Sequence, residues 1–273
     1  MRNILLLTTY ITLAAIPTLP DSPKPGEIKT VSQELPFINS LYVSGKYKIL
    51  LKKGPANLSI SGREANMQFL NTSFDEGKLK LSPHRGPVSY LSKLFNLRTE
   101  DDAKYQIEIT ITAPVLPIIS LTDGVSASTT DNLGILQLYL SDQSSLALQN
   151  NSSPAFDFQV NDTAKLTAHT LTSPKGSIDS SGSSTVDIVS IIPQILHVTQ
   201  TGNSEININQ VKANTLTVDI TDNAKTSIRK AQVGDSFLAL YGASSTLIKR
   251  LNTARLYFKL HGGSQLNILS GEA

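Results

Sequence analysis

Acidic residues at a fixed spacing are the first candidates for chemistry in this chain. Asp142 and Asp162 lie twenty residues apart, and Asp179 and Asp219 lie forty apart. Carboxylates brought together on one face can act as acid and base on a polysaccharide, or can hold a calcium ion. The competing interpretation is turn chemistry, since Asp side chains accept hydrogen bonds from nearby backbone N–H groups. We favour the turn because Gly takes the same place elsewhere in the series, and we predict no catalytic residue.

Basic residues repeat at the same spacing near the C-terminus. Arg229 precedes Lys249 by twenty residues, and Lys230 precedes Arg250 by twenty. If residues twenty apart stack, these four side chains form a basic corner that could hold an anionic glycan or a lipid head group. A solvated edge that keeps the protein soluble and blocks strand addition is the alternative, and it is the one we favour. The four residues remain the candidate ligand-binding site.

Other chemistries lack the residues they need. The chain has no Cys, which excludes disulfides, thiolate metal sites and a thiol nucleophile. Its four His residues show no metal-ligand spacing, and no Gly-x-Ser-x-Gly elbow accompanies an Asp/His pair. The formal net charge of +2 is too small to indicate nucleic-acid binding. We therefore predict no metal, no cofactor and no nucleic-acid partner.

These residues belong to a strict twenty-residue repeat between Leu136 and Ile268. Each unit has Asp or Gly at a hinge, followed two residues later by a small side chain. The hinge residues are Asp142, Asp162, Gly182, Gly202, Asp222, Gly242 and Gly262. The small residues are Ser144, Ala164, Ser184, Ser204, Ala224, Ser244 and Ser264. A tight corner that needs unusual backbone dihedrals, with little space behind it, explains both series.

Alternation within each unit indicates strands with one face turned inward. One apolar column is Leu138, Phe158, Ile178, Val198, Val218, Leu238 and Phe258. A single unit cannot bury such a face alone, but stacked units can. The pattern predicts an all-β fold, a single-stranded right-handed parallel β-helix of about 20 residues per coil, with an irregular N-terminal β cap. An antiparallel sandwich or β-prism with hairpins at the hinges is the alternative.

The N-terminus resembles a secretory signal peptide, with Arg2 ahead of a short apolar run. We predict a signal peptide over 1–16, a linker over 17–35 and one solenoid domain over 36–273. Within that domain, 36–113 forms the N-terminal β portion and 114–273 the regular coils. A short helix is expected within 63–71 and a surface loop within 83–103.

The order of several short segments is similar to the adhesin-like head GIN family of bacterial exported proteins, a domain family of unknown function. The matching segments are Phe37-Ile38, Leu41–Ile49, Lys78–Leu81 and the strand from Ile107 that closes at Ala113-Pro114, followed by Ser/Gly-rich repeats. The resemblance spans about 37–268. It implies a right-handed β-helix with an exported, adhesive role, and offers no catalytic residues.

Three functions follow from these observations. The first is an exported, non-enzymatic, adhesin-like binding protein of the cell envelope, located in the periplasm, at the outer surface or outside the cell. Its partners would be an anionic glycan, a lipid head group or an envelope protein, with no transmembrane segment after signal cleavage. The second is a carbohydrate-active enzyme, a polysaccharide lyase or hydrolase on the same scaffold. The third is a structural component that assembles end to end as a homo-oligomer through the C-terminal coil.

Overall fold

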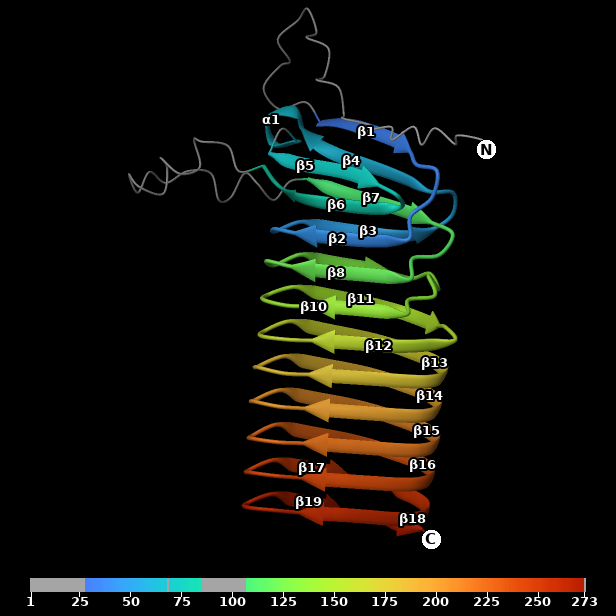
Figure 1. The fold of residues 1–273 in the computed structure, drawn as a ribbon, viewed down its shortest axis with the longest axis vertical. Helices are drawn as coiled ribbons and strands as arrows, with labels where there is room; N and C mark the ends of the chain where they lie inside the picture. The colour runs from blue at the N-terminus through green and yellow to red at the C-terminus, as the bar shows by residue number, and fades with distance from the viewer. Residues whose placement is uncertain (1–27, 68, 85–106, 273) are drawn as a thin grey trace, which may run out of the picture.

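The computed structural model describes residues 28–67, 69–84 and 107–272, which form one long β-sheet wound into a rod (Figure 1). One short helix, α1 (Glu64–Met67), interrupts the strands. The strands are β1 (Ile28–Glu34), β2 (Ser40–Ser44), β3 (Lys48–Lys53), β4 (Asn57–Arg63), β5 (Leu70–Asp75), β6 (Lys78–Pro83), β7 (Glu108–Ala113), β8 (Ile118–Thr122), β9 (Ser126–Thr129), β10 (Gln137–Leu140), β11 (Ser145–Ser152), β12 (Ala155–Val160), β13 (Lys165–Ser180), β14 (Thr185–Gln200), β15 (Glu205–Ile220), β16 (Lys225–Leu240), β17 (Ser245–Ile248), β18 (Leu251–Leu260), β19 (Gln265–Ile268) and β20 (Gly271–Glu272).

The regular part is a right-handed parallel β-helix. Each strand pairs in parallel with the strand one repeat later, so that Ile178 lies beside Val198, which lies beside Val218. In Figure 1 the near strands run to the left and the far strands to the right while the chain descends, which makes the coil right-handed. The predicted fold class is therefore confirmed, and the sandwich and prism alternatives are wrong because like residues stack on like.

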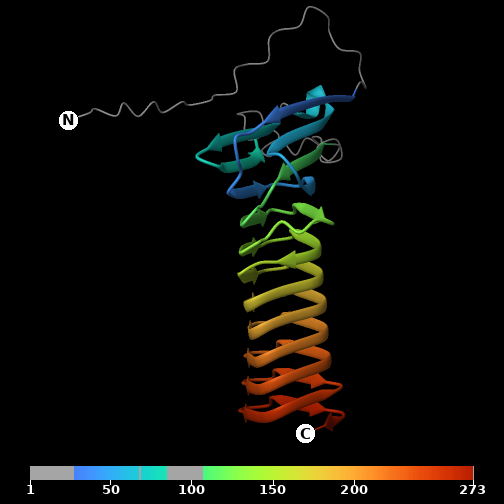
Figure 2. The same cartoon turned by 90° about the vertical axis from the view of Figure 1, so that its right-hand side faces the viewer.

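Each coil has two long faces joined by two different edges. In the coil 176–195 the front face is 176–180, the hinge edge is 181–184, the rear face is 185–188, and the far edge is 189–195. The far edge bends with Ile191 and Pro193 buried, while Val189, Ile192, Gln194 and Ile195 are exposed. Figure 2 looks onto the far edge, where successive coils stack closely along the rod.

The core is filled by the inward columns, whose side chains fit one another between coils. Phe156 pairs with Gly176, and a Cβ added to Gly176 would lie 2.2 Å from the Phe156 ring. The same column carries Leu196 and Leu216 in the next two coils, both fully buried. A missing side chain in one coil thus makes room for a large ring in the coil before it.

The N-terminal portion does not follow sequence order. The pair β2 and β3 lies between the pair β6 and β7 on one side and the pair β8 and β9 on the other, all in parallel. The first coil along the sequence is therefore the second coil in space. Above it, β4 pairs antiparallel with β1 and β7, and β5 pairs antiparallel with β6. These strands form the irregular cap.

The predicted linker, 17–35, is wrong over Ile28–Glu34, where β1 pairs with β4. This strand exposes most of its side chains, so it has no apolar periodicity to detect. Backbone pairing holds it, together with an ion pair of 2.8 Å between Lys29 Nζ and Glu64 Oε2. The helix expected within 63–71 is present as α1, which spans only Glu64–Met67. The predicted signal peptide and most of the predicted surface loop lie outside the described residues.

Candidate functional site

The structure brings the four candidate basic residues together where the rear face meets the far edge. The backbone N–H of Lys249 donates to Ile228 O at 2.9 Å, and that of Arg250 donates to Arg229 O at 3.1 Å. These bonds set Lys249 beside Arg229 and Arg250 beside Lys230 on adjacent coils. We call these four exposed residues the basic corner.

No carboxylate in the described part of the chain pairs with the basic corner. Arg229 reaches only the amide oxygen of Asn209, at 3.5 Å. Asp187, on the same rear face, is already engaged by Lys165 at 3.2 Å and by Asn207 at 3.2 Å. A shallow hollow of about 290 Å³ separates Asp187 from Arg229 and Lys249. The basic corner therefore presents uncompensated positive charge to solvent.

The hinge carboxylates serve the backbone. Asp142, Asp162 and Asp222 have φ of 57°, 60° and 62°, in the left-handed region. The carboxylate of Asp162 accepts the backbone N–H of Asp142 at 3.3 Å, and that of Asp222 accepts the N–H of Gly202 at 3.0 Å. Each of these side chains thus ties its hinge to the hinge of the preceding coil. The turn interpretation of Asp142 and Asp162 is confirmed.

A diagonal line of titratable groups, which the twenty-residue period does not reveal as a set, crosses the front face. Asp157, Asp179, His197 and Asp219 alternate between two outward columns on four successive coils. Burial, with the nearby Asp179 carboxylate, raises the pKa of Asp157 above its ordinary value, although a hydrogen bond from Gln159 opposes this. His197 Nε2 lies 3.7 Å from Asp219 Oδ2 and 3.1 Å from Thr199 Oγ1.

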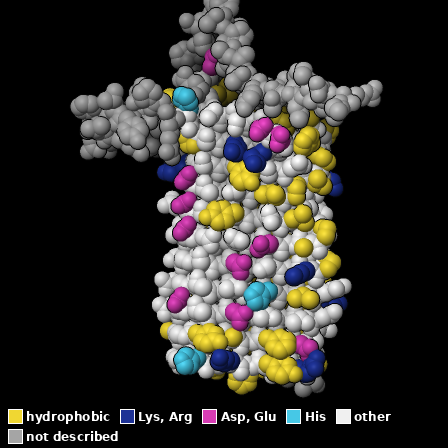
Figure 3. Space-filling view, viewed as in Figure 1, with side chains coloured by type: hydrophobic (Ala, Val, Ile, Leu, Met, Phe, Trp, Pro, Cys, Tyr) yellow, Lys and Arg dark blue, Asp and Glu magenta, His cyan; other side chains and the backbone are white. Residues whose placement is uncertain are grey.

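This diagonal lies on an open surface. Figure 3 shows acidic and histidine side chains down the middle of the front face, with hydrophobic side chains below them. None of the four diagonal residues lines either of the two hollows described for this structure. From each coil to the next, the diagonal shifts by two residues along the strand, alternately forward and backward. Its members are therefore 22 or 18 residues apart, and a search at those spacings would have revealed them.

The larger hollow is a groove along the far edge, with a volume of about 780 Å³. Its floor is a column of mostly small side chains, and its rims carry amides and one lysine. The lining residues are Thr172, Ser173, Pro174, Ile192, Pro193, Gln194, Lys212, Ala213, Asn214, Gln232, Val233, Gly234, Asn252, Thr253 and Ala254. No single residue type marks this groove in the sequence, so it was not predicted.

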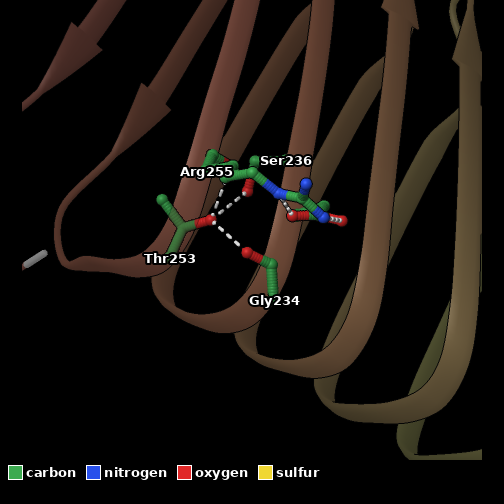
Figure 4. Close-up of polar contacts among 5 residues, drawn as sticks. Gly234, Ser236, Thr253 and Arg255 are labelled. Carbon is green, nitrogen blue, oxygen red and sulfur yellow. Dashed lines mark hydrogen bonds and ion pairs between the residues drawn. The ribbon is translucent and has the colours of Figure 1, made fainter.

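Local hydrogen bonds shape the lower end of this far-edge groove (Figure 4). Thr253 Oγ1 lies 3.1 Å from Gly234 O and 2.9 Å from Arg255 O, and it accepts from Ser236 Oγ at 3.3 Å. The Arg255 guanidinium donates two bonds of 2.6 Å to Asp235. Hydrogen bonding to Arg255 lowers the pKa of Asp235, so this carboxylate stays ionised and paired.

The last described coil leaves inward-column side chains in solvent. Phe258 is 60% exposed and Leu260 is 43% exposed, because the described residues include no further coil to cover them. Beside them, the Phe237 and Tyr257 rings stack at a centroid distance of 4.9 Å, with planes 6° apart. Stacked rings on adjacent coils turn their faces along the rod axis.

The described residues contain neither a cluster of metal ligands nor a membrane-spanning helix. No group of three or more His, Cys, Asp or Glu side chains there could hold a metal ion. No helix within those residues is long and apolar enough to cross a membrane.

Comparison with known proteins shows the fold. No family model matches the chain, and no curated protein matches it. A "putative adhesin" of Parabacteroides distasonis has a TM-score of 0.66 at 11% identity, over 89% of this chain and 98% of that one. A "putative adhesin" of Parabacteroides merdae has a TM-score of 0.64 at 12% identity, over 91% and 98%. A "putative lipid binding protein" of Parabacteroides distasonis has a TM-score of 0.54 at 13% identity, over 89% and 97%. The chain therefore shares its β-solenoid fold with these proteins along nearly their whole length, and membership of the head GIN family stays a prediction.

Proposed function

We propose that this protein is an exported, non-enzymatic, adhesin-like binding rod whose basic corner takes an anionic ligand. The observation that carries the proposal is the set of four exposed, unpaired cations stacked on adjacent coils. Strands on neighbouring coils lie about 4.8 Å apart, so the stacked charges repel one another. A bound anion would relieve that repulsion by pairing with cations on both coils.

Two observations support a binding role over catalysis. The hinge carboxylates are committed to backbone N–H groups, and the front-face diagonal lies outside both hollows. Solved proteins of the same fold are described as adhesins or as a lipid-binding protein, which agrees with this role. An anionic lipid head group and an acidic glycan share the chemistry that the basic corner recognises.

Charge reversal tests this proposal. The mature protein would be titrated with phosphatidylglycerol vesicles, phosphatidylcholine vesicles and an acidic oligosaccharide. We expect binding to the anionic ligands only, and an Arg229→Glu/Lys249→Glu/Arg250→Glu variant to bind at least about tenfold more weakly. A Lys48→Glu/Lys80→Glu/Lys225→Glu variant has the same charge change at exposed positions elsewhere and should bind normally. Equal loss in both variants would show a non-specific charge effect and contradict the proposal.

The exported location rests on the predicted signal peptide over residues 1–16. Expression of the full chain in a bacterial host, followed by fractionation and N-terminal sequencing, tests it directly. We expect the protein outside the cytoplasm with a new N-terminus close to residue 17. Retention in the cytoplasm with an intact N-terminus would remove this part of the proposal.

The carbohydrate-active enzyme stays a second candidate because of one observation. The pKa of Asp157 is raised by burial and by the nearby Asp179 carboxylate, and glycoside hydrolysis uses two neighbouring carboxyl groups. Incubation with a polysaccharide panel, followed by a reducing-end assay, would detect it. Activity that an Asp157→Asn/Asp179→Asn variant loses would favour this candidate over the binding rod.

End-to-end association through the last coil is the third candidate, with a second copy as the partner. Two observations favour it. Phe258 and Leu260 are exposed, and β19 has one parallel partner in the described region, β17, which leaves its outer side available to a second copy. Light scattering over a hundredfold concentration range would show a dimer that Phe258→Asp abolishes. A monomer at every concentration would exclude it.

A further inference from the structure

The far-edge groove has the dimensions of a site for an extended ligand. It crosses five successive coils, from Thr172 to Asn252, which corresponds to about 19 Å along the rod axis. Its volume of about 780 Å³ falls within the range of small-molecule sites. The coils present similar positions at every step, so the groove suits a linear ligand lying parallel to the axis.

The floor of the groove is narrow and largely apolar. Its central column is Ser173, Pro193, Ala213, Val233 and Thr253. The column nearest the front face is Pro174, Gln194, Asn214, Gly234 and Ala254, and its two C-terminal members are the smallest. The small side chains of the central column leave the hollow between the larger residues on either side.

The rims carry amide groups that have no protein partner. The side chains of Gln194, Asn214, Gln232 and Asn252 make no hydrogen bond to any other described residue. Each amide offers two donors and one acceptor, which matches a hydroxyl group that both donates and accepts. A hydrocarbon chain in the same place would leave these groups without partners at a cost in free energy.

The groove is electropositive. Lys212 is its one charged lining residue, and the lining includes no carboxylate. Asp235, next to the groove, is bound by the two short hydrogen bonds from Arg255. Lys230 precedes the rim residue Gln232 by two positions on β16, so the basic corner adjoins the groove.

We propose that the far-edge groove binds a linear acidic glycan lengthwise. The apolar floor contacts the C–H faces of the sugar rings, the rim amides bind hydroxyl groups, and Lys212 pairs with a carboxylate of the glycan. The basic corner attracts the same polymer from the side. This inference rests on the proposed binding function and names its ligand class.

The probe is a hexamer of galacturonic acid, with a neutral cellohexaose as its comparison, measured by calorimetry on the mature chain. We expect the acidic hexamer to bind and the neutral one to bind at least about tenfold more weakly. Lys212→Gln should lower affinity for the acidic hexamer about tenfold, and Asn214→Leu should lower affinity about threefold. Lys225→Gln, an exposed lysine of the rear face, is the matched control and should bind normally.

The outcomes separate this inference from the proposed function. Binding of the acidic hexamer that the basic-corner variant loses and the groove variants keep would overturn the groove and leave the function standing. Binding of anionic vesicles without binding of the hexamer would also overturn the groove proposal and leave the proposed function standing, and it would identify a lipid as the ligand. Equal affinity for the neutral hexamer would overturn the acidic ligand class. Failure of every anionic probe would overturn both proposals. Unchanged melting temperatures would confirm that each variant folds.

Discussion

The two edges of the rod are built under different constraints. From residue 136 onward, every described residue with positive φ lies at the hinge edge, at an Asp or a Gly. The far edge turns the chain through ordinary backbone angles, and its columns vary from Pro to Lys to Gly. Backbone geometry therefore restricts the residue type in every coil at the hinge, whereas at the far edge a close backbone approach is found at Gly234, where an added Cβ would lie 2.7 Å from Asn214 O, and the same column carries Pro, Gln, Asn and Ala in the other coils. An edge of the second kind can acquire a binding surface without losing the fold.

The largest effect should come from a branched side chain at the hinge. In Gly202→Val the new Cβ would lie 2.8 Å from Gly182 O and 3.1 Å from Gly182 N, at a φ of +71°. We expect unfolding in urea to show a loss of about 3 kcal/mol. Ala254→Val at the exposed far edge should change stability by no more than about 0.5 kcal/mol. Similar losses at both sites would erase the contrast between the edges.

A second substitution tests whether the neighbouring Phe156 ring is what restricts position 176 to glycine. Gly176→Leu introduces the residue found at Leu196, but its side chain would collide with the Phe156 ring. We expect a loss of about 2 kcal/mol from overpacking. Adding Phe156→Leu should restore most of that stability, as measured by the urea midpoint. If the double variant is no more stable than the single one, the constraint is not the ring.

Matched serines behind the hinge should differ by about 1 kcal/mol. Ser204 Oγ lies 3.2 Å from Ser180 O and 3.0 Å from Thr201 O, so Ser204→Ala loses a buried hydrogen bond. Ser244 Oγ is buried without a partner in the described structure, so Ser244→Ala should be neutral or stabilising. Thermal unfolding of the two variants side by side checks this. The reverse order would mean that the hydroxyl contacts do not decide stability here.

The smallest effect concerns the front-face diagonal. Because the folded pKa of Asp157 is raised, the folded state binds this proton more readily than the unfolded chain, and stability falls as pH rises toward the folded pKa. Asp157→Asn should therefore stabilise the protein at pH 7 by about 0.5 kcal/mol, and by nothing at pH 3. Urea titrations at both pH values measure the difference. A gain of equal size at pH 3 would point to a cause other than charge.

The hinge residues are the reason why the regular coils could be predicted from the sequence. A corner that admits only Asp or Gly, with Ser or Ala behind it, leaves a period in the sequence that survives every other variation. The displaced coil of β2 and β3 left no such period, because its neighbours β6 and β7 come later in the chain. Columns counted at multiples of twenty brought Arg229 and Lys249 together. They missed the Asp157 diagonal, whose members shift by two residues along the strand from one coil to the next. They also missed the far-edge groove, which depends on side-chain size.

The stacking of one coil on the next also decides how the rod would respond to a pulling force. The hydrogen bonds between coils lie along the rod axis, so an axial load stretches all coil interfaces in series, and the weakest interface yields first. A coil of twenty residues that peels away would lengthen the molecule by about 60 Å. Force spectroscopy would show this as a sawtooth of regular steps, with each rupture absorbing work while the remaining coils stay folded. A rod of this kind yields gradually under load.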